Sequence, residues 1–166
     1  MVLAQVARTQ GDKIIILPVV GSAVLGNYTL ALQVVLVTIM IPQIAYKYIL
    51  PHEATGNPKQ NLKKLTILIS SCCAITGIII SPYVIPEIFP KYNEAIDAIQ
   101  IMLLGLIPTS IYTMYLTKFY SIEKGKIVLI DRLVSALVFI SGIIILGSIF
   151  GILGIAVSYV ISTLVQ

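Results

Sequence analysis

Five long apolar runs, separated by short polar segments, constrain this chain more than any other feature. They cover residues 28–50, 65–85, 95–117, 127–149 and 151–166, and a weaker run lies before residue 25. About 20 apolar residues in a helix cross a bilayer core of about 30 Å, and four of the runs reach that length. A membrane barrel would show alternating strands of about ten residues instead. The pattern therefore predicts an all-α, polytopic membrane helix bundle.

The distribution of basic residues predicts the orientation of this bundle. If the runs pass up and down through a bilayer, ten of the eleven Lys and Arg residues fall on one face. The ten are Arg8, Lys13, Lys47, Lys59, Lys63, Lys64, Lys118, Lys124, Lys126 and Arg132. Only Lys91 falls on the other face. Cytoplasmic loops collect positive charge, so we expect a multi-pass protein of the plasma membrane with a cytoplasmic N-terminus. The net charge of +4 then reflects topology, and we expect the bilayer rather than a nucleic acid as the partner.

The predicted helices make up one transmembrane lobe. Their approximate ranges are 1–25, 28–50, 65–85, 95–117, 127–149 and 151–166. The first is ambiguous, because its apolar part, residues 14–25, would rise only about 18 Å. Either this piece is re-entrant, or the helix begins near Met1 and takes Arg8, Asp12 and Lys13 into the membrane, and we favour the second alternative. Arg8 and Asp12, spaced four apart, would then share a helix face and could pair.

The second predicted helix carries a stripe of polar side chains. Thr29, Gln33, Met40, Gln43 and Lys47 fall within roughly an 80° arc of a helical wheel, and Pro42 lies on the opposite face. Glutamine amides are costly against lipid, so the stripe should face protein or water. Two interpretations stay open, namely hydrogen bonding between helices and the wall of a cavity.

Two further features allow a structural or a functional interpretation. Pro108 interrupts the middle of the run 95–117, and hydroxyl groups cluster beyond it. Prolines in the middle of spans, such as Pro42 and Pro108, mark binding and gating points in transporters, and they also occur as ordinary kinks. Asp131 and Arg132 open the run 127–149. They would serve as an interfacial anchor or as a charged pair that faces a cavity.

Sites for catalysis are missing from the sequence. The seven acidic residues are scattered, and none has the spacing of the aspartate clusters that hold Mg²⁺ in membrane transferases. We find no serine–histidine–aspartate set and no phosphate-binding glycine loop followed by lysine. The lone His52 has no partner nearby, and Cys72 and Cys73 are adjacent packing residues. We therefore expect neither an enzyme nor a cofactor or metal.

The order of several short motifs resembles a known family of membrane proteins. The motifs are residues 12–21 (DKIIILPVVG), 25–31 (LGNYTLA), 41–42 (IP), Pro51, 98–108 (AIQIMLLGLIP), 123–126 (EKGK) and 150–156 (FGILGIA). They are similar to polysaccharide-biosynthesis proteins, the O-antigen-type flippases of the multidrug/oligosaccharidyl-lipid/polysaccharide exporter superfamily. Family members have about twelve or more helices in two lobes, and the first motif is most similar to the start of the C-terminal lobe.

The resemblance implies a flippase that moves a polyprenyl-diphosphate-linked glycan across the membrane by alternating access, as in lipopolysaccharide export. Six helices make at most one lobe, so we expect a half-transporter or a fragment that needs a second lobe, from missing sequence or another chain. The residues expected to line the cavity are Arg8, Asp12, Lys13, Gln33, Gln43 and Lys47, with Pro42 and Pro108 as gating points. The alternatives are a cation antiporter for drugs or metabolites and a non-transporting assembly subunit of a glycan export complex.

Overall fold

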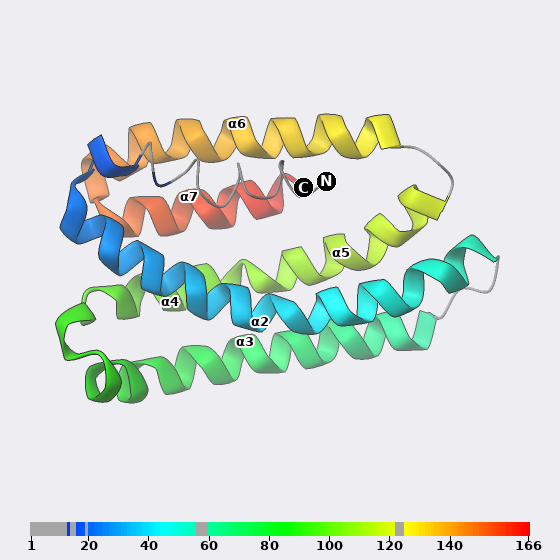
Figure 1. The fold of residues 1–166 in the computed structure, drawn as a ribbon, viewed down its shortest axis with the longest axis horizontal. Coiled ribbons are helices and arrows are strands. Elements are labelled where there is room, and N and C mark those ends of the chain that lie inside the picture. The colour runs from blue at the N-terminus through cyan, green and yellow to red at the C-terminus, as the bar shows by residue number, and fades with distance from the viewer. Residues whose placement is uncertain (1–12, 14–15, 19, 56–59, 122–124) are drawn as a thin grey trace.

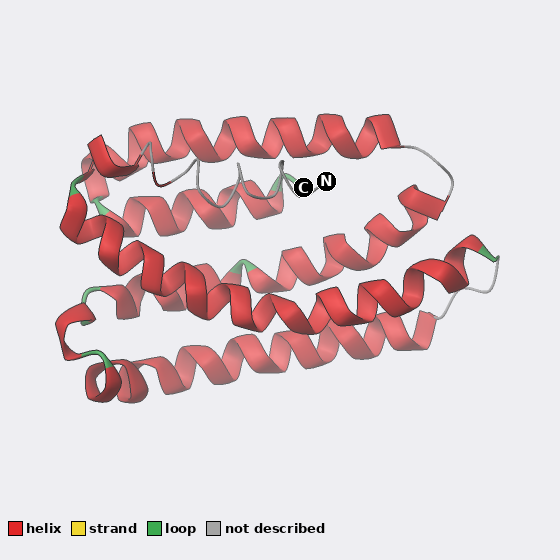
Figure 2. Cartoon of the chain, viewed as in Figure 1, coloured by secondary structure: helices red, strands yellow, loops and turns green. Residues whose placement is uncertain are grey.

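The computed structural model describes residues 13, 16–18, 20–55, 60–121 and 125–166, and every regular element among them is helical (Figures 1 and 2). The helices are α2 (Ser22–Ala54), α3 (Gln60–Ile88), the short 3₁₀ helix η1 (Pro90–Tyr92), α4 (Ala95–Leu104), α5 (Leu106–Ser121), α6 (Gly125–Phe150) and α7 (Ile152–Leu164). The predicted all-α helix bundle is thus confirmed.

Four helical segments are long and apolar enough to cross a membrane. They are α2, α3, α6 and the combined α4–α5 segment, Ala95–Tyr120. A bilayer core of about 30 Å needs about 20 helical residues, and each of these segments has at least 26. The ends of the helices therefore extend beyond the apolar runs. The helix α7 is apolar but shorter, with 13 residues.

Several helix boundaries differ from the prediction, and two of the differences are informative. The first predicted helix was to end near residue 25, yet the chain turns at Gly21 and α2 begins at Ser22. Gly21 has φ +89°, a left-handed conformation that glycine adopts without a Cβ clash, so one residue makes the whole turn. The third predicted helix was to end at residue 85, yet α3 continues through Pro82 and Pro86 to Ile88.

The two mid-span prolines have different effects on their helices. The helix α2 runs through Pro42 without interruption and bends near its middle (Figure 1). The other segment does break, but at Gly105 rather than at Pro108. Proline lacks an N–H and crowds the carbonyl four residues earlier, which here is that of Leu104. The α4–α5 break therefore lies one turn before the proline that causes it.

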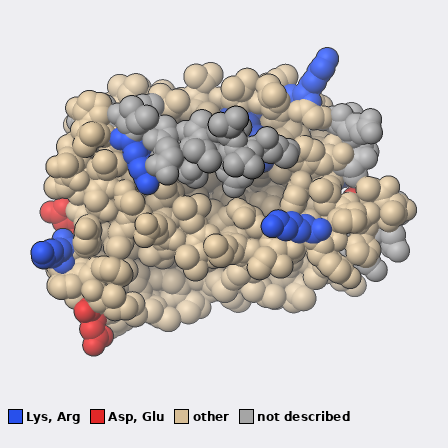
Figure 3. Space-filling view, in the orientation of Figure 1, with Lys and Arg blue, Asp and Glu red and all other residues tan. Residues whose placement is uncertain are grey.

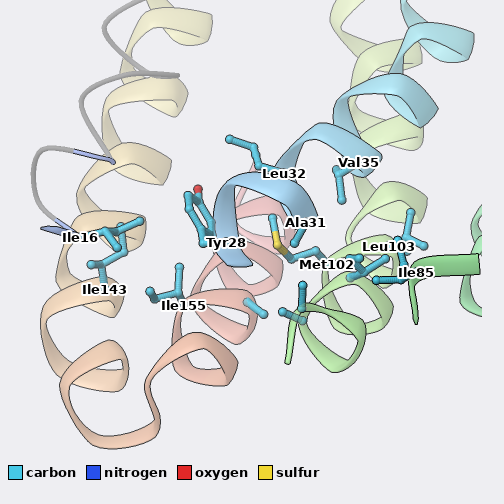
Figure 4. Packing of buried hydrophobic residues seen from close by; sticks show 14 residues of the cluster. Ile16, Tyr28, Ala31, Leu32, Val35, Ile85, Met102, Leu103, Ile143 and Ile155 are labelled. Carbon is cyan, nitrogen blue, oxygen red and sulfur yellow. The ribbon is translucent and has the colours of Figure 1, made fainter. Parts of the chain in front are cut away.

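The buried core joins α2, α4 and α7 (Figure 4). Tyr28 of α2, Met102 of α4 and Ile155 of α7 are almost completely buried in it. Alanines at positions 31, 95, 98 and 156 belong to the same cluster, and such small side chains let helix backbones approach closely. The helix α4 thus lies at the centre, with α2, α3 and α7 packed around it.

The outer surface of the bundle is apolar, as the membrane environment requires. Long stretches of α3 and α6 expose leucine and isoleucine side chains, including Leu68, Leu137 and Ile149, each more than 60% exposed. Monomeric soluble proteins rarely expose contiguous apolar patches larger than a few hundred Å². In Figure 3 uncharged residues cover most of the visible face, and the acidic side chains gather mainly at the left-hand end.

Hydrogen bonds and one ion pair fix the connections at the two ends of the bundle. At one end Lys63 of α3 forms an ion pair with Glu53 of α2, which closes the α2–α3 hairpin. At the other end the Asn27 side-chain amide donates a hydrogen bond to Glu94, 3.1 Å away. Within the span, the Gln100 amide of α4 donates to the Ile78 carbonyl of α3 at 3.1 Å. The helices are therefore joined by specific polar contacts as well as by packing.

Candidate functional site

The polar stripe on α2 lies on the outer surface of the described bundle. Gln33, Gln43 and Lys47 are all exposed, and Pro42 is buried on the opposite side of the helix. Helical spacing places the three polar side chains along one edge of the exposed face. Because lipid offers no hydrogen bonds to a glutamine amide, this edge is unsuited to contact with hydrocarbon chains.

The other edge of the same exposed face is apolar. Val37, Ile44 and Tyr48 are 65%, 70% and 57% exposed. On this side a groove of about 320 Å³ runs between α2 and α3, and Val37 and Cys72 are among its lining residues. The exposed face of α2 is therefore polar mainly on the side away from α3, where the exposed Met40 (58%) interrupts this polar edge, and apolar on the edge beside α3.

Lys13, which the charge pattern placed at the basic face and the resemblance placed in the cavity, is helical and half-buried. It lies eight residues before the turn at Gly21, and residues 14, 15 and 19 between the two are outside the described part of the chain. Arg8 and Asp12 lie outside the described residues.

The hydroxyl cluster beyond Pro108 is satisfied within its own helix. Thr109 donates to the Gly105 carbonyl at 2.7 Å, Ser110 to Leu106 at 2.5 Å and Thr113 to Thr109 at 2.7 Å. Hydroxyl groups that bond to the preceding turn of a helix need no other partner. The cluster is thus a feature of the helix backbone.

A second polar site lies in a cleft between α5, α6 and α7. The cleft has a volume of about 380 Å³, and its lining includes Pro108, Tyr112, Asp131 and Gln166. The Tyr112 hydroxyl and the Asp131 carboxylate interact electrostatically. The Tyr112 hydroxyl oxygen and the Asp131 Oδ2 atom are both buried, and the two side chains are close enough for a hydrogen bond between them. Buried polar atoms are nearly always paired in folded proteins, and these two groups are placed to pair with each other.

Further polar side chains lie near Tyr112 without lining the cleft. Arg132, Tyr46 of α2 and Tyr120 of α5 are close enough to interact electrostatically with one another or with Tyr112. Asp131 faces the cleft, whereas the neighbouring Arg132 is exposed. Two interpretations of Asp131 and Arg132 were open, an interfacial anchor and a charged pair that faces a cavity. The position of the Asp131 carboxylate fits the second. Sequence reasoning did not find the tyrosines, because aromatic residues near the end of a span are also expected as interfacial anchors.

Other chemistry is not supported by the described residues. No group of three His, Cys, Asp or Glu residues in the described ranges could hold a metal ion. The sequence Asn27-Tyr28-Thr29 matches an N-glycosylation motif, but Asn27 is buried within α2 and bonded to Glu94. A glycosyltransferase therefore could not reach its amide in the folded protein.

Comparisons with known proteins add no family to these observations. No protein-family model matches the chain, and neither curated proteins nor solved structures give a match.

Proposed function

We propose that the chain is one lobe of a membrane transporter that moves a polyprenyl-diphosphate-linked glycan across the plasma membrane. The observation that carries the proposal is the polar edge of α2, where Gln33, Gln43 and Lys47 are exposed on a membrane-spanning helix. A water-filled cavity between two lobes would satisfy these groups. The glycan specificity rests on the resemblance of the sequence motifs to O-antigen-type flippases.

The two edges of α2 have separate roles in this proposal. The polar edge faces the cavity, where Lys47 attracts the diphosphate and the glutamine amides bind sugar hydroxyl groups. The apolar edge, with Val37 and Ile44, stays against lipid or against the second lobe. The resemblance assigns Arg8, Asp12 and Lys13 to the same cavity, and of these the structure describes Lys13, which is half-buried.

Orientation follows from the described lysines. Lys47, Lys63 and Lys64 lie near the α2–α3 connection, and Lys126 lies at the start of α6 at the same end of the bundle (Figure 1). Lys91 belongs to η1 at the opposite end. Because cytoplasmic loops retain positive charge, we place the α2–α3 connection in the cytoplasm. This gives a cytoplasmic N-terminus if the segment before Gly21 crosses the membrane once.

The test is export by the whole transporter in cells that depend on it for surface glycan. We expect Gln43→Leu and Lys47→Gln to reduce glycan export at least tenfold, with unchanged amounts of protein in the membrane. The matched control is Val37→Leu on the apolar edge, which should export normally. Neutralising Arg8 or Asp12 should also abolish export. Normal export by all four cavity variants would refute the proposal.

Two alternative functions predict different results in the same cells. A drug or metabolite antiporter would confer resistance to cationic dyes and leave the surface glycan unchanged. A non-transporting assembly subunit would copurify with a glycan polymerase and give no flux in liposomes.

A further inference from the structure

The charges on α3 indicate how deep this helix sits in a bilayer. Lys64 and Glu87 lie near its two ends, and the sequence between them has no charged residue. A helix separates these two positions by about 35 Å, close to the thickness of about 30 Å of the hydrocarbon core. Tyr83, one turn before Glu87, is 76% exposed, and tyrosine rings gather at the edge of the hydrocarbon core. Glu87 therefore lies at this edge, and the residues after it reach the headgroup layer.

The residues at this edge continue the apolar surface of α3. Ile80, Val84 and Ile88 are spaced four apart and therefore share one face of the helix, and they are 46%, 38% and 60% exposed. Phe89, which comes directly after α3, is 42% exposed. A loop in water is normally built from polar side chains, whereas aromatic side chains are enriched in the headgroup layer. The membrane-facing surface thus extends past Glu87 to Phe89.

Packing against α2 holds the short helix η1 in a defined position. Side chains three apart share a face of a 3₁₀ helix, and the rings of Phe89 and Tyr92 meet edge to face with their centroids 6.4 Å apart. The Tyr92 ring lies against α2, because a Cβ atom added at Gly26 would be 3.4 Å from the Tyr92 Cε1 atom. Tyr92 therefore joins Phe89 to α2. Lys91, which is exposed, lies on a different face of η1.

We propose that residues 88–92 form a membrane anchor, in which Ile88 and Phe89 insert among the upper parts of the lipid acyl chains and Lys91 lies among the headgroups. The partner is the bilayer, because the patch continues the surface by which α3 faces lipid. The anchor lies at the end of the bundle opposite the α2–α3 connection (Figure 1). It fixes the height of α3 and α4 in the membrane, whichever cargo the protein carries.

The test measures the depth of residue 89 in phosphatidylcholine vesicles. The chain contains no tryptophan, so the fluorescence of a Phe89→Trp variant of the full chain reports from one position. The vesicles carry bromine atoms, which quench tryptophan on contact, either near the headgroup end or near the methyl end of the acyl chains. We expect bromine near the headgroup end to cause the larger loss of fluorescence, and iodide in the water to cause little. Ile88→Trp should give the same result, which keeps the test decisive if Phe89→Trp misfolds.

Two control variants calibrate the measurement. Ile75→Trp changes a residue that is 54% exposed midway between Lys64 and Glu87, and bromine near the methyl end should quench it best. The matched control is Lys91→Trp on the other face of η1, which iodide should quench more strongly than it quenches Phe89→Trp. Quenching of residue 89 by iodide and not by brominated lipid would place the connection in water and overturn the proposal. Protection from both quenchers would mean that protein covers the patch, which equally refutes a lipid anchor.

Discussion

The contact between α6 and α7 gives the most quantitative prediction about stability. Gly142 of α6 lies directly against Ser158 of α7, and a Cβ atom added at Gly142 would be 2.6 Å from the Ser158 Oγ atom and 2.7 Å from its Cβ atom. Ordinary contacts begin at 3.4 Å. Gly142→Ala must therefore push the two helices apart by several tenths of an ångström. Overpacking of this kind costs about 1–3 kcal/mol.

A compensating change separates this steric effect from a general loss of stability. Ser158→Gly removes both crowding atoms and leaves the Ser158 Cα atom 3.5 Å from the new Cβ. Glycine in a helix costs about 1 kcal/mol, so Ser158→Gly alone should destabilise the chain. The double variant should nevertheless be more stable than the sum of the single changes, with a coupling of about 1–2 kcal/mol.

The assay is unfolding of the purified chain in mixed micelles by increasing amounts of dodecyl sulphate, followed by circular dichroism. The matched control is Gly125→Ala at the start of α6, where an added Cβ meets nothing within 4 Å. It should unfold at the same detergent fraction as the wild-type chain or a slightly higher one. If Gly142→Ala were as stable as the control, or if the double variant showed no coupling, the packing of α6 on α7 described above would be wrong.

Three further predictions concern other parts of the bundle. Glu53→Gln should lower the free energy of unfolding by about 1 kcal/mol in the same assay, which is the upper range for a partly exposed ion pair. Exchanging Glu53 and Lys63 should restore part of this loss, and equal stability of all variants would contradict a stabilising ion pair. Asn27→Ala loses the hydrogen bond to the loop before α4, and we expect a loss of about 1 kcal/mol; an unchanged unfolding midpoint would show that this bond is absent in the membrane. Cys72 is exposed and Cys73 is half-buried, so a lipid-soluble maleimide should modify Cys72 faster than Cys73 in intact membranes. Equal rates would mean that α3 is rotated about its own axis relative to the described structure.

The sequence predicts the helices well because their cause is local. Runs of apolar residues long enough to cross a bilayer have few alternatives to helix, and α2, α3 and α6 follow the predicted runs. The turn at Gly21 was harder to predict, because the residues after it, from Ser22 to Asn27, are uncharged and are compatible with a loop as well as with a helix. Only the left-handed conformation of Gly21 locates the turn.

The candidate sites depend on contacts between helices, which a single sequence does not display. The stripe on α2 could be predicted, because residues spaced along one helix share a face whatever surrounds them. That Gln33 and Gln43 remain exposed depends on how α3, α4 and α5 pack against α2. The approach of Tyr112 to Asp131 joins two helices across the α5–α6 connection, and neither residue has a distinctive sequence context. The hydroxyl cluster after Pro108, conversely, looked like a site but is satisfied by its own backbone.

Accessibility to water along α2 tests the central claim most directly. Single cysteines would be placed in the whole transporter by Gln43→Cys, Lys47→Cys, Val37→Cys and Tyr48→Cys, with both native cysteines changed to alanine. All four positions are exposed on the same helix, and helical spacing places the first two on the polar edge and the last two on the apolar edge. A water-soluble maleimide supplied on both sides of the membrane should modify the cysteines at positions 43 and 47 and leave those at 37 and 48 unmodified. Equal labelling at all four positions, or labelling confined to 37 and 48, would contradict a cavity along the polar edge.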